Sequence, residues 1–210
     1  MPAESGSFSP GRRVAVLLSG AGTLLQALLD GAAQPGCAFD VVAAIADRQG
    51  AAGLDRARQA GVPASIVAAS GYQDRTAWNR ALAERVGGFE PDLIVLAGFM
   101  RLVGEPLLTA YHGRILNTHP ALLPAFAGAH GVRDALAYGV KVTGCSIIMV
   151  DAGIDTGPIV AQRAVEVRQD DDEETLHERI KVVERALLVE VVGRMTKAGW
   201  SVDGRTVRIG

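Results

Sequence analysis

The stretch that decides the fold is Val14-Ala15-Val16-Leu17-Leu18-Ser19-Gly20-Ala21-Gly22-Thr23-Leu24-Leu25-Gln26-Ala27-Leu28-Leu29. Its first five residues form a short apolar run, which is typical of a buried β-strand. The two glycines then mark a turn, and the four leucines recur at helical spacing on one stripe. The stretch therefore predicts a strand, a glycine-rich turn and a helix in direct succession.

The same alternation continues through the first half of the chain. Further strands are predicted at 41–46, 65–67 and 92–97, and further helices at 54–60, 74–86 and 105–111. Alternation of this kind is typical of an α/β fold with a Rossmann-like, doubly wound and mostly parallel sheet. The later strands are closer together, so we expect a mixed sheet at the C-terminal edge, built from residues 114–118, 142–150 and 159–167. A helix at 130–138, a long helix at 173–197 and a hairpin at 200–209 complete the prediction.

The composition is that of an ordinary globular protein. The 210 residues are 49% hydrophobic and 21% charged, which suits one domain with its own core. We expect a disordered leader at residues 1–12, which are rich in Ser, Gly, Pro and Ala, and a single domain at 13–210. The two cysteines and four scattered histidines lack metal-ligand spacing, so no metal is predicted.

Charge and hydropathy narrow the class of partner. The net charge of −2 lacks the basic footprint of a nucleic-acid-binding protein, and no apolar run reaches the length of a membrane span. The scarcity of cysteine and the lack of a secretory signal indicate a cytoplasmic protein with small-molecule partners. The sequence leaves the oligomeric state open, and a homodimer is one of the states it allows.

The loop after the first strand has two interpretations. Glycines at the start of a helix let the backbone approach an anion, and the helix N-terminus offers free N–H groups, so Gly20, Gly22 and Thr23 could hold a phosphate. Alternatively, Gly20 and Gly22 begin a dinucleotide-binding fingerprint in which Asp47 would bind the ribose. That fingerprint requires a third glycine where this chain has Leu25, which disfavours the second interpretation.

A candidate catalytic set follows two later strands. Asn117 and His119 are two residues apart, so in an extended segment both side chains project to one face. The amide can donate to a developing oxyanion, the imidazole can polarise the same oxygen, and Asp155 could orient the imidazole. Taken alone, Asp155 lies in a Gly/Pro-rich turn, where aspartate is common as a local acceptor. Taken with Asn117 and His119, it points to acyl transfer to an amine.

These residues carry a resemblance to the folate-dependent formyltransferases, over nearly the whole chain from about Arg13 to Gly210. Ser19-Gly20-Ala21-Gly22-Thr23 resembles the family's phosphate loop, and Ala97-Gly98-Phe99-Met100-Arg101 resembles its folate-binding segment. Asn117, His119 and Asp155 fall on the family's catalytic triad. The order of these motifs is specific, although none of them would be specific alone.

The resemblance implies a function, which we state as an expectation. The chain would transfer a formyl group from 10-formyltetrahydrofolate to the amine of glycinamide ribonucleotide in purine synthesis, by direct attack and without a metal. By the same resemblance, the ribonucleotide would be bound by Gly20, Ala21, Gly22, Thr23, Leu24, Gly98 and Glu184. The folate would be bound by Arg75, Met100, Arg101, Leu102, Val103 and Asp155.

Some positions depart from the family pattern. Ile148 stands where a histidine is usual in the purine branch, Leu24 where an asparagine is common, and Ala127 where a proline is usual. These departures keep three alternatives open: a formyltransferase for another amine such as an amino sugar or specialised metabolite, a methionyl-tRNA formyltransferase, and a ligand-binding relative with weakened catalysis. The tRNA enzymes carry a further C-terminal RNA-binding domain, and formyltetrahydrofolate hydrolases an N-terminal one, which we do not expect here.

Overall fold

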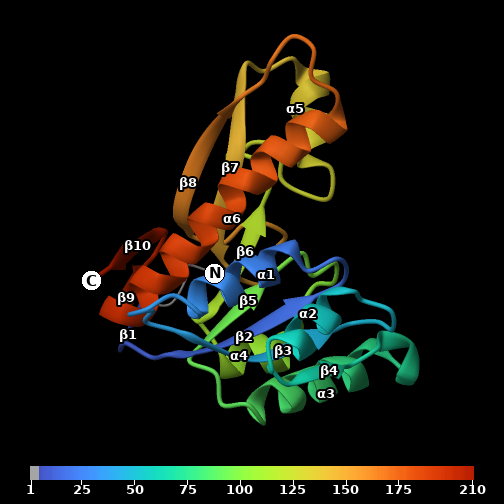
Figure 1. Ribbon diagram of the computed structural model, residues 1–210, viewed down its shortest axis with the longest axis vertical. Helices are drawn as coiled ribbons and strands as arrows, with labels where there is room; N and C mark the ends of the chain where they lie inside the picture. The colour runs from blue at the N-terminus through green and yellow to red at the C-terminus, as the bar shows by residue number, and fades with distance from the viewer. Residues whose placement is uncertain (1–4) are drawn as a thin grey trace.

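The computed structural model of the protein describes residues 5–210, and a mostly parallel sheet crosses it with helices on both faces (Figure 1). Within these residues the sheet has seven strands in the order β4-β3-β2-β5-β6-β7-β8. The parallel part consists of β2 (Arg13–Leu18), β3 (Asp40–Ala46), β4 (Ala64–Ile66), β5 (Leu93–Leu96) and β6 (Ile115–His119). The antiparallel edge consists of β7 (Val142–Met149) and β8 (Ile159–Glu166). The predicted α/β class and mixed C-terminal edge are confirmed.

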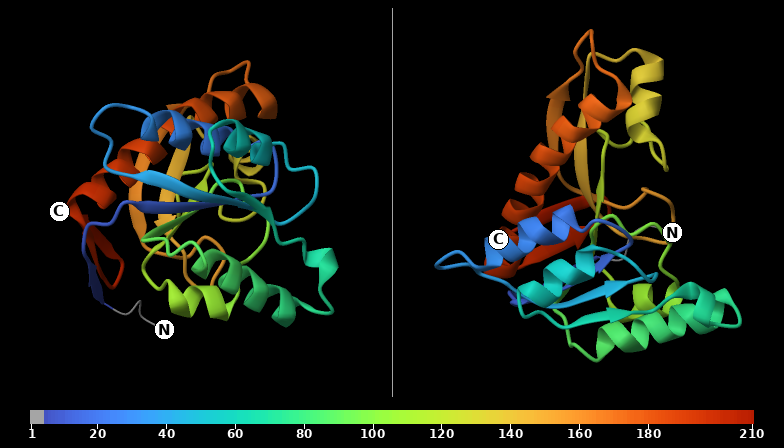
Figure 2. Two further views of the ribbon diagram at one scale, coloured as in Figure 1. Left: turned by 60° about the horizontal axis from the view of Figure 1, so that its bottom comes forward. Right: turned by 45° about the vertical axis from the view of Figure 1, so that its right-hand side comes forward.

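Two layers of helices bury the two faces of the sheet, as the left view of Figure 2 shows. One layer contains α1 (Thr23–Ala32), α2 (Gly53–Gln59) and α6 (Glu173–Ala198). The other contains α3 (Arg75–Gly87) and α4 (Glu105–Ala110). Strand β2 contributes side chains to the cores on both faces of the sheet, because successive side chains of a strand point to opposite faces. Val14, Val16 and Leu18 belong to one core cluster, and Ala15 and Leu17 to the other.

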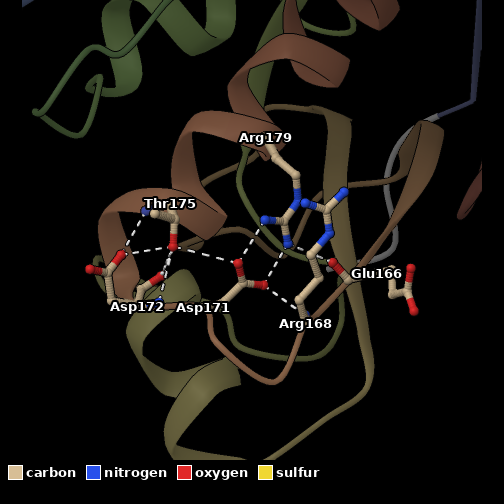
Figure 3. Close-up of polar contacts among 6 residues, drawn as sticks. All are labelled: Glu166, Arg168, Asp171, Asp172, Thr175 and Arg179. Atoms are coloured by element: carbon tan, nitrogen blue, oxygen red, sulfur yellow. Dashed lines mark hydrogen bonds and ion pairs between the residues drawn. The ribbon is translucent and has the colours of Figure 1, made fainter.

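The antiparallel edge extends away from the body of the molecule. Strands β7 and β8, helix α5 (Gly131–Tyr138) and the first turns of α6 form the upper part of Figure 1. Asp172 caps α6 by accepting from the backbone N–H of Thr175 at 2.8 Å, while the Thr175 hydroxyl accepts from the backbone N–H of Asp172. The adjacent Asp171 pairs with Arg179, whose guanidinium also donates to the Glu166 carbonyl at 2.9 Å (Figure 3). These contacts fix the start of α6 against the end of β8.

The prediction of a disordered leader at residues 1–12 is wrong in part. Residues 1–4 lie outside the described residues, but Gly6–Phe8 forms β1, which pairs antiparallel with β9 (Trp200–Asp203). Strand β10 (Thr206–Ile209) completes this small second sheet and confirms the predicted C-terminal hairpin. Phe8 stacks on Trp200 with ring centroids 5.2 Å apart, and this aromatic contact orders a segment whose Ser, Gly and Pro content indicates disorder.

The chain reverses its direction of strand addition between β2 and β5. It adds β3 and β4 on one side of β2, and then β5 and β6 on the other. The loops that leave β2 and β5 are in contact there, because the backbone N–H of Met100 donates to Ser19 Oγ at 2.8 Å. Ligands of open α/β sheets bind at the carboxyl ends of the strands at such a switch point. The topology thus places the two predicted ligand loops side by side.

Candidate active site

A cavity of about 720 Å³ opens at the carboxyl ends of β2, β5 and β6. Its walls are formed by the glycine-rich loop after β2, the segment after β5, the end of β6, the loop after β7 and one face of α6. The residues predicted from the sequence that line it are Gly20, Ala21, Gly22, Thr23, Leu24, Gly98, Met100, Arg101, Leu102, Val103, Asn117, His119, Asp155 and Glu184. The structure therefore brings together residues from five separate segments. Arg75 does not line the cavity; its guanidinium donates to the carbonyl oxygen of Leu102 at 3.2 Å.

The loop after β2 has the geometry of an anion site. Gly22 precedes α1 with a φ of 70°, a left-handed conformation that favours glycine. A Cβ at this position would lie 2.5 Å from the Cα of Gly53, so the two backbones can approach only without side chains. No side chain among the described residues caps the N-terminus of α1. The first-turn N–H groups and the positive end of the helix dipole are consequently available to a bound anion.

A polar stripe of α6 forms a further wall of the cavity, and only Glu184 in it was predicted from the sequence. His177, Lys181, Glu184 and Arg185 line the cavity. Their spacing of four, three and one residues places them on one face of a helix, which is the signal that could have identified them. Lys181 and Arg185 add positive charge near the anion loop. Burial and the charge of Lys181 lower the pKa of His177, which favours its neutral form.

Glu184 is a buried carboxyl group within this positive wall. Only 5% of the residue is exposed, and burial raises the pKa of its carboxyl above the usual value. A hydrogen bond with Thr118 and the charges of Lys181 and Arg185 oppose this effect without cancelling it. A buried acceptor that bears a desolvation cost is suited to receive a ligand hydroxyl, because the ligand then supplies the hydrogen bond that water cannot.

Asn117, His119 and Asp155 meet at the end of β6. The Asn117 side-chain amide donates to Asp155 Oδ1 at 3.4 Å, and Asp155 Oδ2 lies 3.4 Å from His119 Nδ1. His119 Nε2 faces the carbonyl oxygen of Phe126 at 2.8 Å. The second hydrogen of the Asn117 amide stays available for an oxyanion in the cavity. The predicted juxtaposition of an amide, an imidazole and a carboxylate thus exists in the structure.

Asp155 is held in an uncommon backbone conformation. Its φ is 54°, in the left-handed region, which aspartate enters more readily than most residues other than glycine and asparagine but which still costs free energy. Its Oδ2 atom accepts a hydrogen bond from the backbone N–H of Gly128 at 2.9 Å. The preceding turn is fixed by Asp151, whose carboxylate accepts from the Gly153 N–H and the Thr156 hydroxyl. Asp151 takes the local turn role, which leaves the Asp155 carboxylate for the cavity.

The end of β5 and the segment after it form an apolar wall. Leu96, Phe99 and Val103 are buried and line the cavity, and the Phe99 ring stacks on Trp78. Met100 and Leu102 are exposed at its rim, with 76% and 47% of their surfaces accessible. Exposed apolar side chains beside a cavity are typical of a binding site for a partly apolar ligand.

Asp47 is held by two arginines at the edge of the cavity. Its buried carboxylate pairs with Arg101 at 2.8 Å and with Arg48 at 3.2 Å. Burial alone would raise the pKa of Asp47, but the hydrogen bonds with Arg48, Ser19 and Arg101 lower it below the usual value. This carboxylate is therefore engaged by protein groups, unlike the free acid of a dinucleotide site. Leu25 is fully buried where the dinucleotide fingerprint needs glycine.

Ile148 lies directly opposite Asn117 in the β6–β7 register. Residues opposite each other in an antiparallel pair project to the same face, so Ile148 lies beside the Asn117 amide. It is 2% exposed and lines the cavity. This side of the triad is apolar in this chain, as its sequence indicated.

Two further observations concern the described part of the chain. Residues 5–210 contain no group of three or more His, Cys, Asp or Glu side chains placed to hold a metal ion. No helix in the same range combines the length and the apolar character needed to cross a membrane.

Comparison with known proteins gives the family. The family described as "Formyl transferase" matches residues 12–192. The chain is 53% identical to a phosphoribosylglycinamide formyltransferase of Mycobacterium tuberculosis, over 94% of this chain and 91% of that protein. It is 36% identical to that of Bacillus subtilis, over 88% of this chain and 94% of that protein. The structure of glycinamide ribonucleotide transformylase 1 from Symbiobacterium toebii superposes with a TM-score of 0.92 at 47% identity, and covers 94% of this chain and 93% of that chain. This chain therefore belongs to the formyl transferase family.

Proposed function

We propose that this enzyme transfers the formyl group of 10-formyltetrahydrofolate to the amine of glycinamide ribonucleotide, and that residues 13–210 act as its single catalytic domain. The observation that carries the proposal is the meeting of Asn117, His119 and Asp155 in a cavity that an anion loop and an apolar wall also line. A phosphorylated amine and a folate are the two ligands that this loop and this wall suit. The names of the relatives agree with formyl transfer as the reaction and with glycinamide ribonucleotide as the acceptor.

The binding roles follow from the anion loop and the apolar wall of the cavity. The backbone N–H groups at Gly20–Thr23 and the charges of Lys181 and Arg185 would hold the phosphate. Glu184 would accept from a ribose hydroxyl. The pterin ring would pack on the wall that contains Leu96, Phe99 and Val103, while Met100, Arg101 and Leu102 border it.

The three central side chains then account for the chemistry. As the substrate nitrogen bonds to the formyl carbon, the carbonyl oxygen becomes an oxyanion, which the Asn117 amide and His119 stabilise by donation. The attacking nitrogen loses a proton, and the folate nitrogen gains one as its bond to carbon breaks and the carbonyl re-forms. Asp155 holds His119 by charge and assists this proton movement. The transfer is direct, and no bond to the protein forms.

Incubation of the purified protein with both substrates tests this proposal. We expect formylglycinamide ribonucleotide and tetrahydrofolate to appear in equal amounts by mass spectrometry. Asn117→Ala should slow the transfer by about 100-fold or more, which is typical for the loss of one oxyanion donor. Folate binding without transfer to this amine would refute the acceptor assignment. Transfer to methionyl-tRNA or to an amino sugar instead would assign the site to another branch of the family.

A further inference from the structure

The imidazole of His119 has two different neighbours. Nε2 lies 2.8 Å from the Phe126 carbonyl oxygen, which is a normal hydrogen-bond distance. A carbonyl oxygen can only accept, so the nitrogen facing it must carry a hydrogen. Nδ1 lies 3.4 Å from Asp155 Oδ2, which already accepts from the Gly128 N–H at 2.9 Å. The contact at Nε2 is therefore the closer one, and Nδ1 is the less constrained nitrogen.

The Phe126 carbonyl is held in place by its own conformation and by α5. Phe126 has a φ of 56°, a strained left-handed conformation for a residue with a large side chain. Its ring makes an edge-on contact with Tyr138 on α5, with centroids 5.9 Å apart and an interplanar angle of 63°. Strain of this kind persists only where the surroundings determine the conformation. In this protein the left-handed conformation of Phe126 directs its carbonyl oxygen toward the buried imidazole of His119.

Gly131, the first residue of α5, leaves the space for this hydrogen bond. A Cβ on Gly131 would lie 3.0 Å from the Phe126 oxygen and 3.1 Å from His119 Nε2. Both distances are tighter than ordinary contacts with a Cβ atom, so an added methyl group would displace one of the two partners. The φ of Gly131 is not in the left-handed region, so alanine is compatible with its backbone. The backbone conformation does not require glycine at this position. The lack of a side chain instead leaves room for the hydrogen bond between His119 and Phe126.

We propose that Phe126 and Gly131 are positioning residues that keep Nε2 of His119 protonated, so that Nδ1 is the nitrogen whose protonation changes during catalysis. This inference rests on the proposed catalytic role of His119. The opposite arrangement, with a hydrogen on Nδ1 pointing to Asp155 and a bare Nε2, would direct a lone pair at the Phe126 oxygen. With Nε2 protonated, Nδ1 accepts or gives a proton beside Asp155, which lines the cavity.

Nitrogen NMR of the intact protein without substrates tests the proton position. Long-range proton–nitrogen correlation spectra of uniformly ¹⁵N-labelled protein would be recorded at neutral and alkaline pH. The His119 signals would be assigned by their loss in His119→Gln. We expect Nε2 to carry a hydrogen throughout, and Nδ1 to be the nitrogen without one in alkaline solution. A bare Nε2 together with a protonated Nδ1 would overturn the inference, and this result requires no variant of Phe126 or Gly131.

Gly131→Ala tests the positioning role, with Gly87→Ala as the matched control. Gly87 is also helical, and a Cβ there meets nothing within 4 Å. We expect Gly131→Ala to change the His119 nitrogen signals and to lower kcat about tenfold, with KM values little changed, since small misplacements of catalytic groups have effects of this size. The control should change neither. Unaltered His119 signals in Gly131→Ala would overturn the role of Gly131, whatever the rate.

The two proposals fail in different ways. Absence of formyl transfer, together with a protonated Nε2, would count against the proposed reaction. A bare Nε2 in a protein that transfers the formyl group normally would count against the positioning inference alone.

Discussion

Asp155→Asn removes the negative charge of the triad and preserves the shape of the side chain. The carboxylate oxygen lies 3.4 Å from His119 Nδ1, and the two side chains are only 11% and 5% exposed. At an effective dielectric constant of about 20, a unit charge at this distance stabilises a protonated imidazole by about 5 kcal/mol. Loss of that stabilisation in the transition state corresponds to a fall in kcat of about 4,000-fold.

The hydrogen bonds of Asp155 predict the same direction. Its two oxygens accept from the Gly128 N–H and from the Asn117 amide. An asparagine has one acceptor and one donor, so one of these two partners would face an NH₂ group. Either the loop at Gly128 or the oxyanion donor Asn117 would lose its contact.

Steady-state formyl transfer measures the effect, and thermal unfolding by circular dichroism checks that the variant is folded. Asp134→Asn is the matched control, because it removes the same charge from an exposed side chain that is 45% accessible and outside the cavity. We expect the control to retain parental kcat. A folded Asp155→Asn variant within about tenfold of the parent would refute the electrostatic role of Asp155, since the distance and burial require a larger loss.

Three further predictions concern the walls of the cavity and the start of α6. In Glu184→Gln we expect a weaker ribonucleotide interaction, with KM raised about tenfold or more. Because burial raises the pKa of Glu184, the unfolded chain loses this proton at a lower pH than the folded protein does. The folded protein therefore loses stability as the pH rises above about 4.5 and through the folded pKa. Glutamine has no such proton, so the stability of the variant relative to the parent should be greater at neutral pH than at acid pH. In Asp171→Asn we expect a lower Tm near neutral pH, because the Arg179 pair lowers the pKa of Asp171 to about 2, and the stability it adds above the usual value of 3.8 is lost as pH falls through 2. In Gly22→Ala we expect KM for the ribonucleotide to rise about tenfold with folate affinity retained, since a left-handed φ and a contact with Gly53 both oppose a side chain.

Each of these predictions has an outcome that contradicts it. Equal pH dependence of Tm in Glu184→Gln and the parent would argue against a desolvated carboxyl. An unchanged acid limb of the unfolding profile in Asp171→Asn would show that the pair with Arg179 adds no pH-dependent stability. Loss of folate and ribonucleotide binding together in Gly22→Ala would indicate general damage to the fold, and no change in either would remove the glycine loop from the phosphate site.

The elements of the fold could be predicted because their signals are local. Apolar runs, leucine stripes and glycine or proline breaks identified the strands and helices within a few residues. The helix predicted at 74–86, for example, begins where the side chain of Asp74 accepts from the Ala77 N–H. The segment Gly6–Phe8 could not be assigned in this way. Its order comes from pairing with β9 and stacking on Trp200, nearly two hundred residues away in the chain.

The residues of the candidate site also differ in whether a local sequence signal identifies them. Asn117 and His119 could be paired from the sequence, because two residues on one strand share a face. The wall of α6 was largely missed, because charged residues at helical spacing are as common on solvent-exposed faces as on cavity walls. Arg75 was assigned to the folate by resemblance, whereas its guanidinium contacts the backbone of Leu102 and lies outside the cavity lining.

The sequence by itself determined the order of strands and helices, the glycine loop and the chemical types of the triad, because these depend on periodicity and on residues close together in the chain. Only the tertiary structure decided that the Asp155 carboxylate lies beside His119 and that the carbonyl oxygen of Phe126, in the loop after β6, lies within hydrogen-bond distance of Nε2. Such contacts depend on how β6, β7 and their loops pack, and packing distances between separate elements are not encoded in any local pattern. The same packing made a buried Glu184 and an apolar Ile148 neighbours of the site.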